Sequence, residues 1–244
     1  MFSTKKMRLN ILNKQSSEGN KQSNFISYAI REIILVVIGI LIAVSINNWN
    51  ENRKKNNELN QLLVKVKEDL KTDLIKIDKV IEHYENIKPV FEKVLKSEYT
   101  IEDYKMNPNI ALLIFGYPEL ALNQRGVSLL EDFKGDIKTE KEILVQELVI
   151  FYKEQLWEIK VDDELRSKDY KENFTYWKNN TDWWLDYVQL KITNEFIDYA
   201  LKSRDYKTRV ATAEFFAYKV YLPELDKFKQ KGLELIDKIE KINE

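Results

Sequence analysis

The chain has 244 residues, of which 39 are Lys or Arg and 40 are Asp or Glu, and its formal net charge is -1. This balance argues against a nucleic-acid partner, and the absence of cysteine excludes disulfides, thiolate catalysis and cysteine-ligated metal sites. Only six Gly and four Pro accompany abundant Leu, Ile, Lys and Glu, a composition typical of long helices. We therefore predict an all-α protein.

The first predicted segments are a basic tail over residues 1–24 and a transmembrane helix over residues 25–50. The uncharged apolar run within this helix, residues 33–46, has only 14 residues, whereas a span needs roughly 20. Its flanks supply the missing length, because a helix from Tyr28 to Trp49 measures about 33 Å at 1.5 Å per residue. The two aromatic residues lie where interfacial anchors are found in membrane proteins.

Basic residues flank this run unevenly. The 32 residues before it carry six Lys or Arg, and the twenty residues after it carry four. The positive-inside rule therefore predicts a cytoplasmic N-terminus and a C-terminal domain on the other side of the membrane. The alternative is a cleaved secretory signal that ends at the small pair Ala43 and Ser45, although the bulky Ile46 and the long leader favour a span.

One face of the predicted span carries Glu32, Gly39 and Ala43, because spacings of seven and four residues return to the same side of a helix. Gly39 and Ala43 form a small-xxx-small pair, which lets two helix backbones approach closely. A glutamate beside the membrane core is costly unless it is paired or close to the interface. This face is thus a candidate association surface. The alternative is that Glu32 meets only Arg31 or headgroup water.

The segment YAIREIILVVIGILIAVSINNWNENRKK, residues 28–55, resembles the N-terminal segment of an uncharacterised family of single-span membrane proteins found in Bacteroidetes. Two shorter stretches, residues 126–130 and 148–152, are similar to the soluble part of the same family. The resemblance implies an envelope protein of a Gram-negative bacterium. Together with the charge bias, it leads us to expect a protein of the cytoplasmic membrane whose C-terminal domain lies in the periplasm. It implies no activity, catalytic residue or ligand.

Residues 51–244 are predicted to form a helical soluble domain. Apolar residues recur every seven positions along residues 63–94 in two registers that only Asp73 interrupts, so we expect a long helix over residues 58–87. Pro89 is expected to end or kink this helix, because proline removes a backbone donor and clashes with the preceding turn.

The C-terminal helix, which follows Pro223, repeats the same apolar spacing. Two such seams favour antiparallel packing of the long N- and C-terminal helices in one bundle. The alternative is a parallel coiled coil between two copies, in which Asp73 sets the register. Asn179, Asn180 and Thr181 are predicted to cap a helix start. Between the two long helices we expect helices over residues 109–122, 139–160, 163–178, 181–201 and 205–222.

The sequence offers little for catalysis or metal binding. His83 is the only histidine, and we interpret it as a solvated residue on a helix face. No Glu-x-x-His pair, phosphate loop or nucleophile elbow occurs. The neighbouring carboxylates Asp162 and Asp163 are interpreted as residues at a helix start, where negative charge is favoured by the helix dipole. We expect no cofactor, no metal and no enzymatic activity.

The densest aromatic region covers residues 170–187. Trp177 shares a helix face with other aromatic residues, whereas the adjacent Trp183 and Trp184 point about 100° apart, so they are not expected to face one core. Core packing is the favoured interpretation. The alternative is an exposed tryptophan that stacks on a sugar ring or anchors a partner protein.

The sequence as a whole favours a membrane-anchored module of the bacterial envelope that acts by protein–protein interaction or self-association. Its expected partners are the lipid bilayer and either a second copy of the chain or another envelope protein. The alternative function is a membrane-tethered ligand sensor or hydrolase that acts on envelope material through the aromatic region, with Trp177, Trp183 and Trp184 as candidate contact residues.

Overall fold

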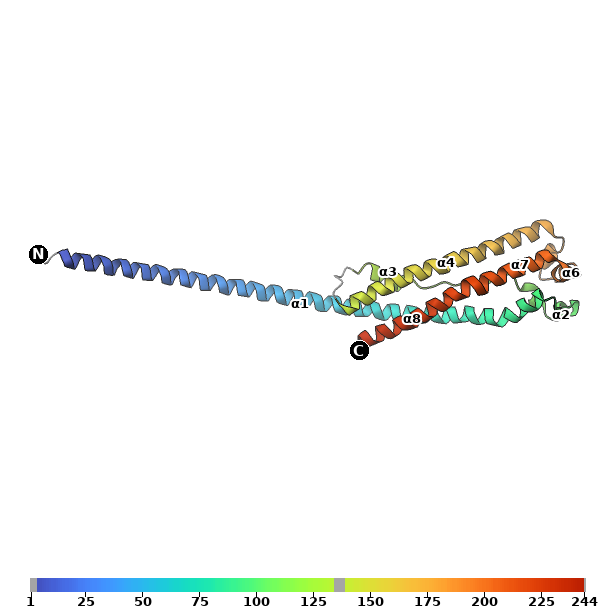
Figure 1. Cartoon of the computed structure of the whole chain (residues 1–244), viewed down its shortest axis with the longest axis horizontal. Coiled ribbons are helices and arrows are strands. Elements are labelled where there is room, and N and C mark those ends of the chain that lie inside the picture. The colour runs from blue at the N-terminus through green and yellow to red at the C-terminus, as the bar shows by residue number, and fades with distance from the viewer. Residues whose placement is uncertain (1–3, 134–138, 244) are drawn as a thin grey trace. The chain divides into compact units, whose positions relative to one another are not determined.

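The computed structural model describes residues 4–133 and 139–243, with side chains for residues 27–133 and 139–242. Within these ranges the chain contains helices and no strand, which confirms the all-α prediction (Figure 1). The side chains of the basic tail and Gly135 lie outside the described residues. The helices in chain order are α1 (Thr4–Leu95), α2 (Ile101–Met106), the 3₁₀ helix η1 (Pro108–Leu112), α3 (Arg125–Glu131), α4 (Glu140–Asn180), α5 (Trp184–Tyr187), α6 (Asn194–Lys202), α7 (Arg204–Phe215), the π-helix η2 (Phe216–Tyr221) and α8 (Leu222–Asn243).

The chain divides into two units, Met1–Glu58 and Leu59–Glu244. The described side chains of the first unit belong to a single helix whose apolar residues face outward. In the part of the chain that the structure describes, one helix is long and apolar enough to cross a membrane, and it lies near the N-terminus. The second unit is a helical bundle with its own core, so the predicted order of an apolar N-terminal helix followed by a helical region is confirmed.

Three long helices run side by side in the second unit (Figure 1). Residues 59–95 of α1 and helix α8 are antiparallel, because Lys71 Nζ lies 3.5 Å from Glu240 while Lys229 Nζ lies 2.6 Å from Asp78. Helix α4 runs parallel to α1, since Lys141 donates to Asn60 near one end and Arg166 donates to Tyr84 further along. The predicted antiparallel packing of the N- and C-terminal helices is therefore confirmed.

The apolar seams of these helices form the core. All five seven-residue positions that α1 contributes are buried, as are four apolar residues of α8. They pack in two clusters, one around the α1–α4–α8 contacts and one at the end of the bundle that includes α2, η1, α5 and α6. The buried seam residues are Leu63, Leu70, Ile77, Tyr84 and Phe91 on α1 and Leu225, Phe228, Leu235 and Ile239 on α8.

Pro89 lies inside α1 and does not end it, so the expected helix end near residue 87 is wrong, whereas the alternative of a kink stays a prediction. The helix continues to Leu95 because Phe91 and Val94, which follow the proline, are buried in the second cluster. The actual end is a Schellman motif, in which Ser97 has a φ of 60° and the amide of Glu98 donates to the carbonyl of Lys93.

The expected helix over residues 109–122 is wrong beyond the short η1 turn. Residues 113–124 form an irregular strap whose backbone groups bond to distant side chains instead of to a helical ladder. Lys76 donates to the carbonyl of Ala121, Arg166 donates to that of Pro118, and the amide of Asn123 donates to Asp73. Because these partners are remote in sequence, the local pattern could not reveal them.

The later helix boundaries also differ from the prediction. Helix α4 is one continuous element where we expected a break near residue 161, since no Gly or Pro interrupts it. Thr181 ends α4 by donating to the carbonyl of Trp177 and does not begin the next helix. The expected helix over residues 181–201 is divided into α5 and α6, with Thr193 capping α6. Helix α7 continues through η2 into α8, so the chain stays helical around Pro223.

Candidate functional site

The tryptophans proposed from the sequence lie in one aromatic cluster at the end of the bundle. Trp177 and Trp183 are 0% and 6% exposed, and Trp184 is half-buried against the same cluster. Phe115 of the strap stacks on Trp177 with a centroid distance of 4.2 Å and also contacts Trp183, Trp184 and Tyr187. The adjacent Trp183 and Trp184 therefore pack in one core, contrary to our expectation, because the ring of Phe115 contacts both of them.

A buried arginine, which sequence reasoning missed, lies between the two apolar clusters. Arg166 of α4 is 6% exposed and its Nη2 atom donates to the hydroxyl of Tyr84 at 2.6 Å. Its guanidinium carbon lies 3.8 Å from the ring centroid of Tyr221 and 4.7 Å from that of Tyr117. Burial raises the pKa of Tyr221 to about 12, and it also raises that of Tyr84 although the cation nearby acts in the opposite direction. The cation is thus enclosed by neutral tyrosine rings.

A second arginine, Arg209 of α7, extends this polar region along α4 by contacting Asn173. Arg209 of α7 forms a bidentate pair with Asp205, with distances of 2.9 and 3.0 Å, and donates to Asn173 Oδ1 at 2.6 Å. Asn173 in turn donates to Asp169, whose pKa is raised by burial. We call Arg166, Arg209, Asp169, Asn173 and Asp205 the arginine layer. On α4 this layer lies between Ile159 of the first cluster and Trp177 of the second.

The π-helix η2 contributes Tyr221 to the rings around Arg166. A π turn is wider than an α turn and is frequent at functional sites. Here Tyr218 of η2 donates to the backbone carbonyl of Tyr84 at 2.5 Å, and Tyr221 at the end of η2 stacks on Arg166. A cavity of about 40 Å³ lies beside them, lined by Arg166, Asp169 and apolar side chains. It is large enough for a water molecule but far smaller than a metabolite pocket.

Two aspartates of α1 fix the strap and the start of α3. Asp73 is fully buried, and its carboxylate accepts from the backbone amide of Asn123 at 3.0 Å and from Lys76 at 3.2 Å. Burial raises the pKa of Asp73 although these bonds act to lower it. Asp69 accepts from the amide of Gly126 at 3.0 Å. Asp73, which we considered as a register-setting residue between two copies, thus has partners within its own chain.

The remaining titratable candidates form no catalytic arrangement. His83 is exposed, as expected, and burial together with the charge of Arg166 lowers its pKa. Asp162 and Asp163 lie inside the continuous α4 and not at a helix start, and burial raises the pKa of each carboxyl. Among the described residues no group of three or more His, Asp or Glu side chains could hold a metal ion.

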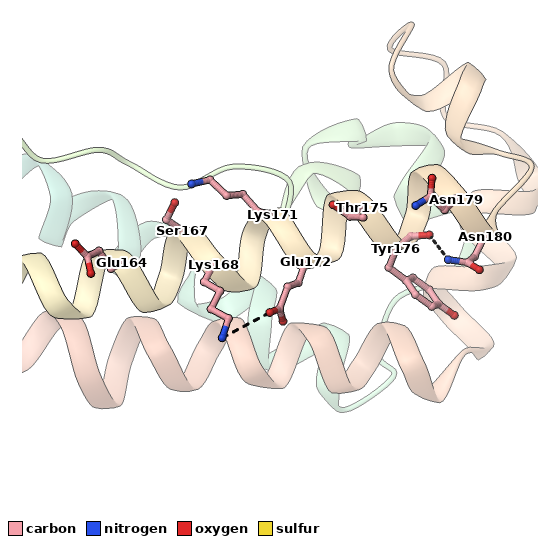
Figure 2. Close-up of a pocket in the computed structure, with 9 residues that line it drawn as sticks. All are labelled: Glu164, Ser167, Lys168, Lys171, Glu172, Thr175, Tyr176, Asn179 and Asn180. Carbon is pink, nitrogen blue, oxygen red and sulfur yellow. Dashed lines mark hydrogen bonds and ion pairs between the residues drawn. The ribbon is translucent and has the colours of Figure 1, made fainter.

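A shallow hollow follows the outer face of α4 (Figure 2). All of its lining residues belong to this one helix, and their polar groups pair locally, as in the 3.9 Å contact between Lys168 and Glu172. Asn180 donates to the backbone carbonyl of Tyr176 within the same face. Because these polar groups pair with neighbours along the same helix, the hollow is a solvated polar surface and holds no converging set of functional groups.

The candidate association residues Glu32, Gly39 and Ala43 are exposed on the helix of the first unit. A methyl group added at Gly39 would meet no atom within 4 Å. This face is therefore open in the single chain, as an association surface requires.

Residues 32–107 match a family of unknown function, DUF6090. The chain is thus similar to an uncharacterised family from Glu32 of the apolar helix to Asn107, which follows α2. No curated protein and no solved structure matches the chain. The matched stretch includes Gly39, Ala43 and Asp73, whereas Arg166 and the three tryptophans lie outside it.

Sequence reasoning missed the arginine layer for a physical reason. A lone arginine in a charged helix is indistinguishable from a surface residue, and Tyr84 lies 82 positions away. One signal was present: Tyr152, Ile159, Arg166 and Asn173 recur every seven residues on the buried face of α4. If this seven-residue repeat is continued past Ile159, it predicts that Arg166 is buried in the bundle.

Proposed function

We propose that this protein is a membrane-anchored helical module of the bacterial envelope that acts by protein–protein interaction or self-association. In this proposal it crosses the cytoplasmic membrane once, with a cytoplasmic N-terminus and a periplasmic bundle. The resemblance of residues 28–55 to single-span proteins of Bacteroidetes supports the envelope location. The excess of basic residues before the span supports the orientation.

The observation that carries the proposal is the exposure of the apolar helix. The eleven Ile, Leu and Val side chains between Ile33 and Ile46 are 47% to 73% exposed in the single chain. Burying a side chain of this kind stabilises it by roughly 1.5–3 kcal/mol relative to water. A run of eleven is therefore stable only where lipid or protein covers it, and a bilayer covers every side of such a helix.

The described residues support a binding role more than a catalytic one. Trp177 and Trp183 are buried in the core, so a ligand sensor or hydrolase would have to use the open part of Trp184 alone. The cavity beside Arg166 and Asp169 is too small for a metabolite. An interaction module therefore accounts for these residues better than a hydrolase or a ligand sensor.

Alkaline extraction and crosslinking in intact membranes test this proposal. We expect the protein to remain in the membrane pellet at high pH, and crosslinked species to contain a second copy or another envelope protein. A C-terminal reporter active only in the periplasm would agree with the proposed orientation. Release into the supernatant would contradict the membrane span. Reporter activity only in the cytoplasm would contradict the orientation, and a strictly monomeric protein without a retained partner would contradict the interaction role.

A further inference from the structure

One side of the apolar helix carries a shallow apolar hollow of about 360 Å³. Its lining residues recur at helical spacing and so share one face, which rises about 16 Å along the axis at 1.5 Å per residue. Ser45 is the smallest of them, and the larger side chains around it form the walls. The lining residues are Ile38, Leu41, Ile42, Ser45, Ile46 and Trp49. Such a groove has the shape and apolar chemistry of a contact for one hydrocarbon chain.

A cation lies at the end of this hollow. The guanidinium carbon of Arg53 is 5.3 Å from the ring centroid of Trp49, four residues earlier. Helical side chains tilt toward the N-terminus, so this contact holds the charge back toward the apolar run. Trp49 lies about 4.5 Å beyond Ile46 along the helix, within the headgroup layer, which is roughly 5–8 Å deep. Arg53 is thus directed to the depth at which lipid phosphates lie.

The charges around Arg53 favour an anionic headgroup. Lys54 and Lys55 follow it directly, and among the described residues no carboxylate pairs with Arg53 or Lys54 within 4 Å. The nearest acidic residue in sequence, Glu51, accepts from Asn47 at 2.9 Å. Residues two apart on a helix do not face each other, so Glu51 does not cover the Arg53 face.

We propose that this surface binds an anionic phospholipid of the surrounding bilayer, with one acyl chain along the hollow and the phosphate bonded to Arg53. The inference rests on the proposed membrane span and goes beyond it, because it assigns a lipid contact to particular residues. Arg53 supplies a planar donor for phosphate oxygens, and Trp49 holds that donor at the interface.

The test uses the full chain reconstituted into vesicles of equal parts phosphatidylglycerol and phosphatidylcholine, followed by mild extraction and mass spectrometry of the retained lipid. One phosphate contact to a basic residue corresponds to roughly a five-fold preference for the anionic lipid. We expect Arg53→Gln to bring the ratio of the two lipids close to one. Lys54→Gln removes the same charge from a neighbouring face, about 100° away from the Arg53 contact with Trp49, so it is expected to lower the ratio less than Arg53→Gln does. Ser45→Leu fills the hollow and should lower the total lipid retained.

Each outcome has a distinct meaning. A ratio near one in the unaltered protein, or an equal loss in Arg53→Gln and Lys54→Gln, would overturn the lipid site. An unchanged amount of retained lipid in Ser45→Leu would show that the hollow is not part of the lipid site. Alkaline extraction of the same vesicles separates the two proposals: release of the unaltered protein contradicts the span itself, whereas a retained protein without lipid preference contradicts only this inference.

Discussion

Arg166 is a cation buried inside the bundle. Arg166 is held by Tyr84, Tyr117 and Tyr221, so its charge is compensated by hydroxyl, carbonyl and ring contacts and by a 3.4 Å approach to Asp163. Such a group is costly to disrupt, because removing one partner leaves the others buried and unsatisfied.

We expect Arg166→Met to lower the free energy of unfolding by about 3 kcal/mol, because Tyr84 and the Pro118 carbonyl lose their donor inside the bundle. Denaturant unfolding of the full chain in mild detergent, followed by tryptophan fluorescence, measures this. Lys168→Met is the matched control, since it removes a charge from the exposed face of the same helix. An equal decrease in the free energy of unfolding in the two variants would show that the buried contacts of Arg166 do not stabilise the bundle.

Leu190 offers the opposite experiment. It has a φ of 62° in the turn after α5, a backbone conformation that is strained for leucine. Its side chain is 82% exposed, so little packing offsets this strain. Leu190→Gly should raise the free energy of unfolding by about 1 kcal/mol. Thermal unfolding gives the comparison, with Leu185→Gly in the adjacent short helix as a variant that should be destabilised. Lower stability in Leu190→Gly would mean that the exposed leucine makes a contact in the native protein.

At the scale of elements, the contact of α3 with α1 depends on a glycine. A Cβ atom at Gly126 would lie 2.8 Å from Asp69 Oδ2, 2.9 Å from Val66 Cγ2 and 3.2 Å from the Val66 backbone. The Asp69 hydrogen bond to the Gly126 amide requires this close approach.

Gly126→Ala is therefore expected to destabilise the protein by about 1–3 kcal/mol, the usual cost of overpacking. Gly116→Ala serves as its control, because a Cβ there meets no atom within 4 Å. Chemical denaturation of both variants decides the point. An unchanged midpoint for Gly126→Ala would imply that α3 can move away from α1 without cost.

Helices α4 and α8 are joined by a pH-sensitive ion pair. Glu147 accepts from Lys231 and Lys238, each at 2.7 Å. Burial alone would raise the pKa of Glu147, but the bonds from the two lysines outweigh it and hold the pKa below its ordinary 4.5. A carboxyl whose pKa is lower in the folded state stabilises the fold above its unfolded pKa, and this stabilisation is lost as the pH falls through the folded value.

The difference in unfolding midpoint between the unaltered protein and Glu147→Gln should accordingly be largest near neutral pH and shrink below pH 4.5. Comparing the two proteins cancels the opposite effect of Asp73, Asp162, Asp163 and Asp169, whose pKa values are raised by burial. A difference that stays constant with pH would show that the ion pair does not link the helices energetically.

For the whole molecule, the boundary between the two units gives a direct prediction. Both apolar clusters are built from residues at or after Leu59. A fragment of residues 59–244 should therefore fold without the apolar helix and remain in solution, because the exposed run of residues 33–46 is removed. Circular dichroism and a cooperative thermal transition would establish this. An aggregated or unfolded fragment would mean that the first unit is required for folding.

Much of the fold was predictable because it follows from local periodicity. The uncharged run Ile33 to Ile46 and its aromatic flanks indicate a membrane helix, and the repeated seams on α1 and α8 predict their antiparallel pairing. The candidate site was less predictable. Trp177 was correctly assigned to the core, whereas the shared packing of Trp183 and Trp184 depends on Phe115, which no spacing rule connects to them.

The sequence by itself thus determined helix content, the apolar helix near the N-terminus and the buried stripes, since each depends on residues a few positions apart. Tertiary structure alone decided the irregular strap, the continuity of α1 through Pro89 and the partners of the arginine layer. In each of these, local preference is overridden by partners that folding brings from distant positions, as when Tyr84 and Arg166 meet across two helices. The apolar helix, which the uncharged run of residues 33–46 predicts, is the feature on which the proposed function depends.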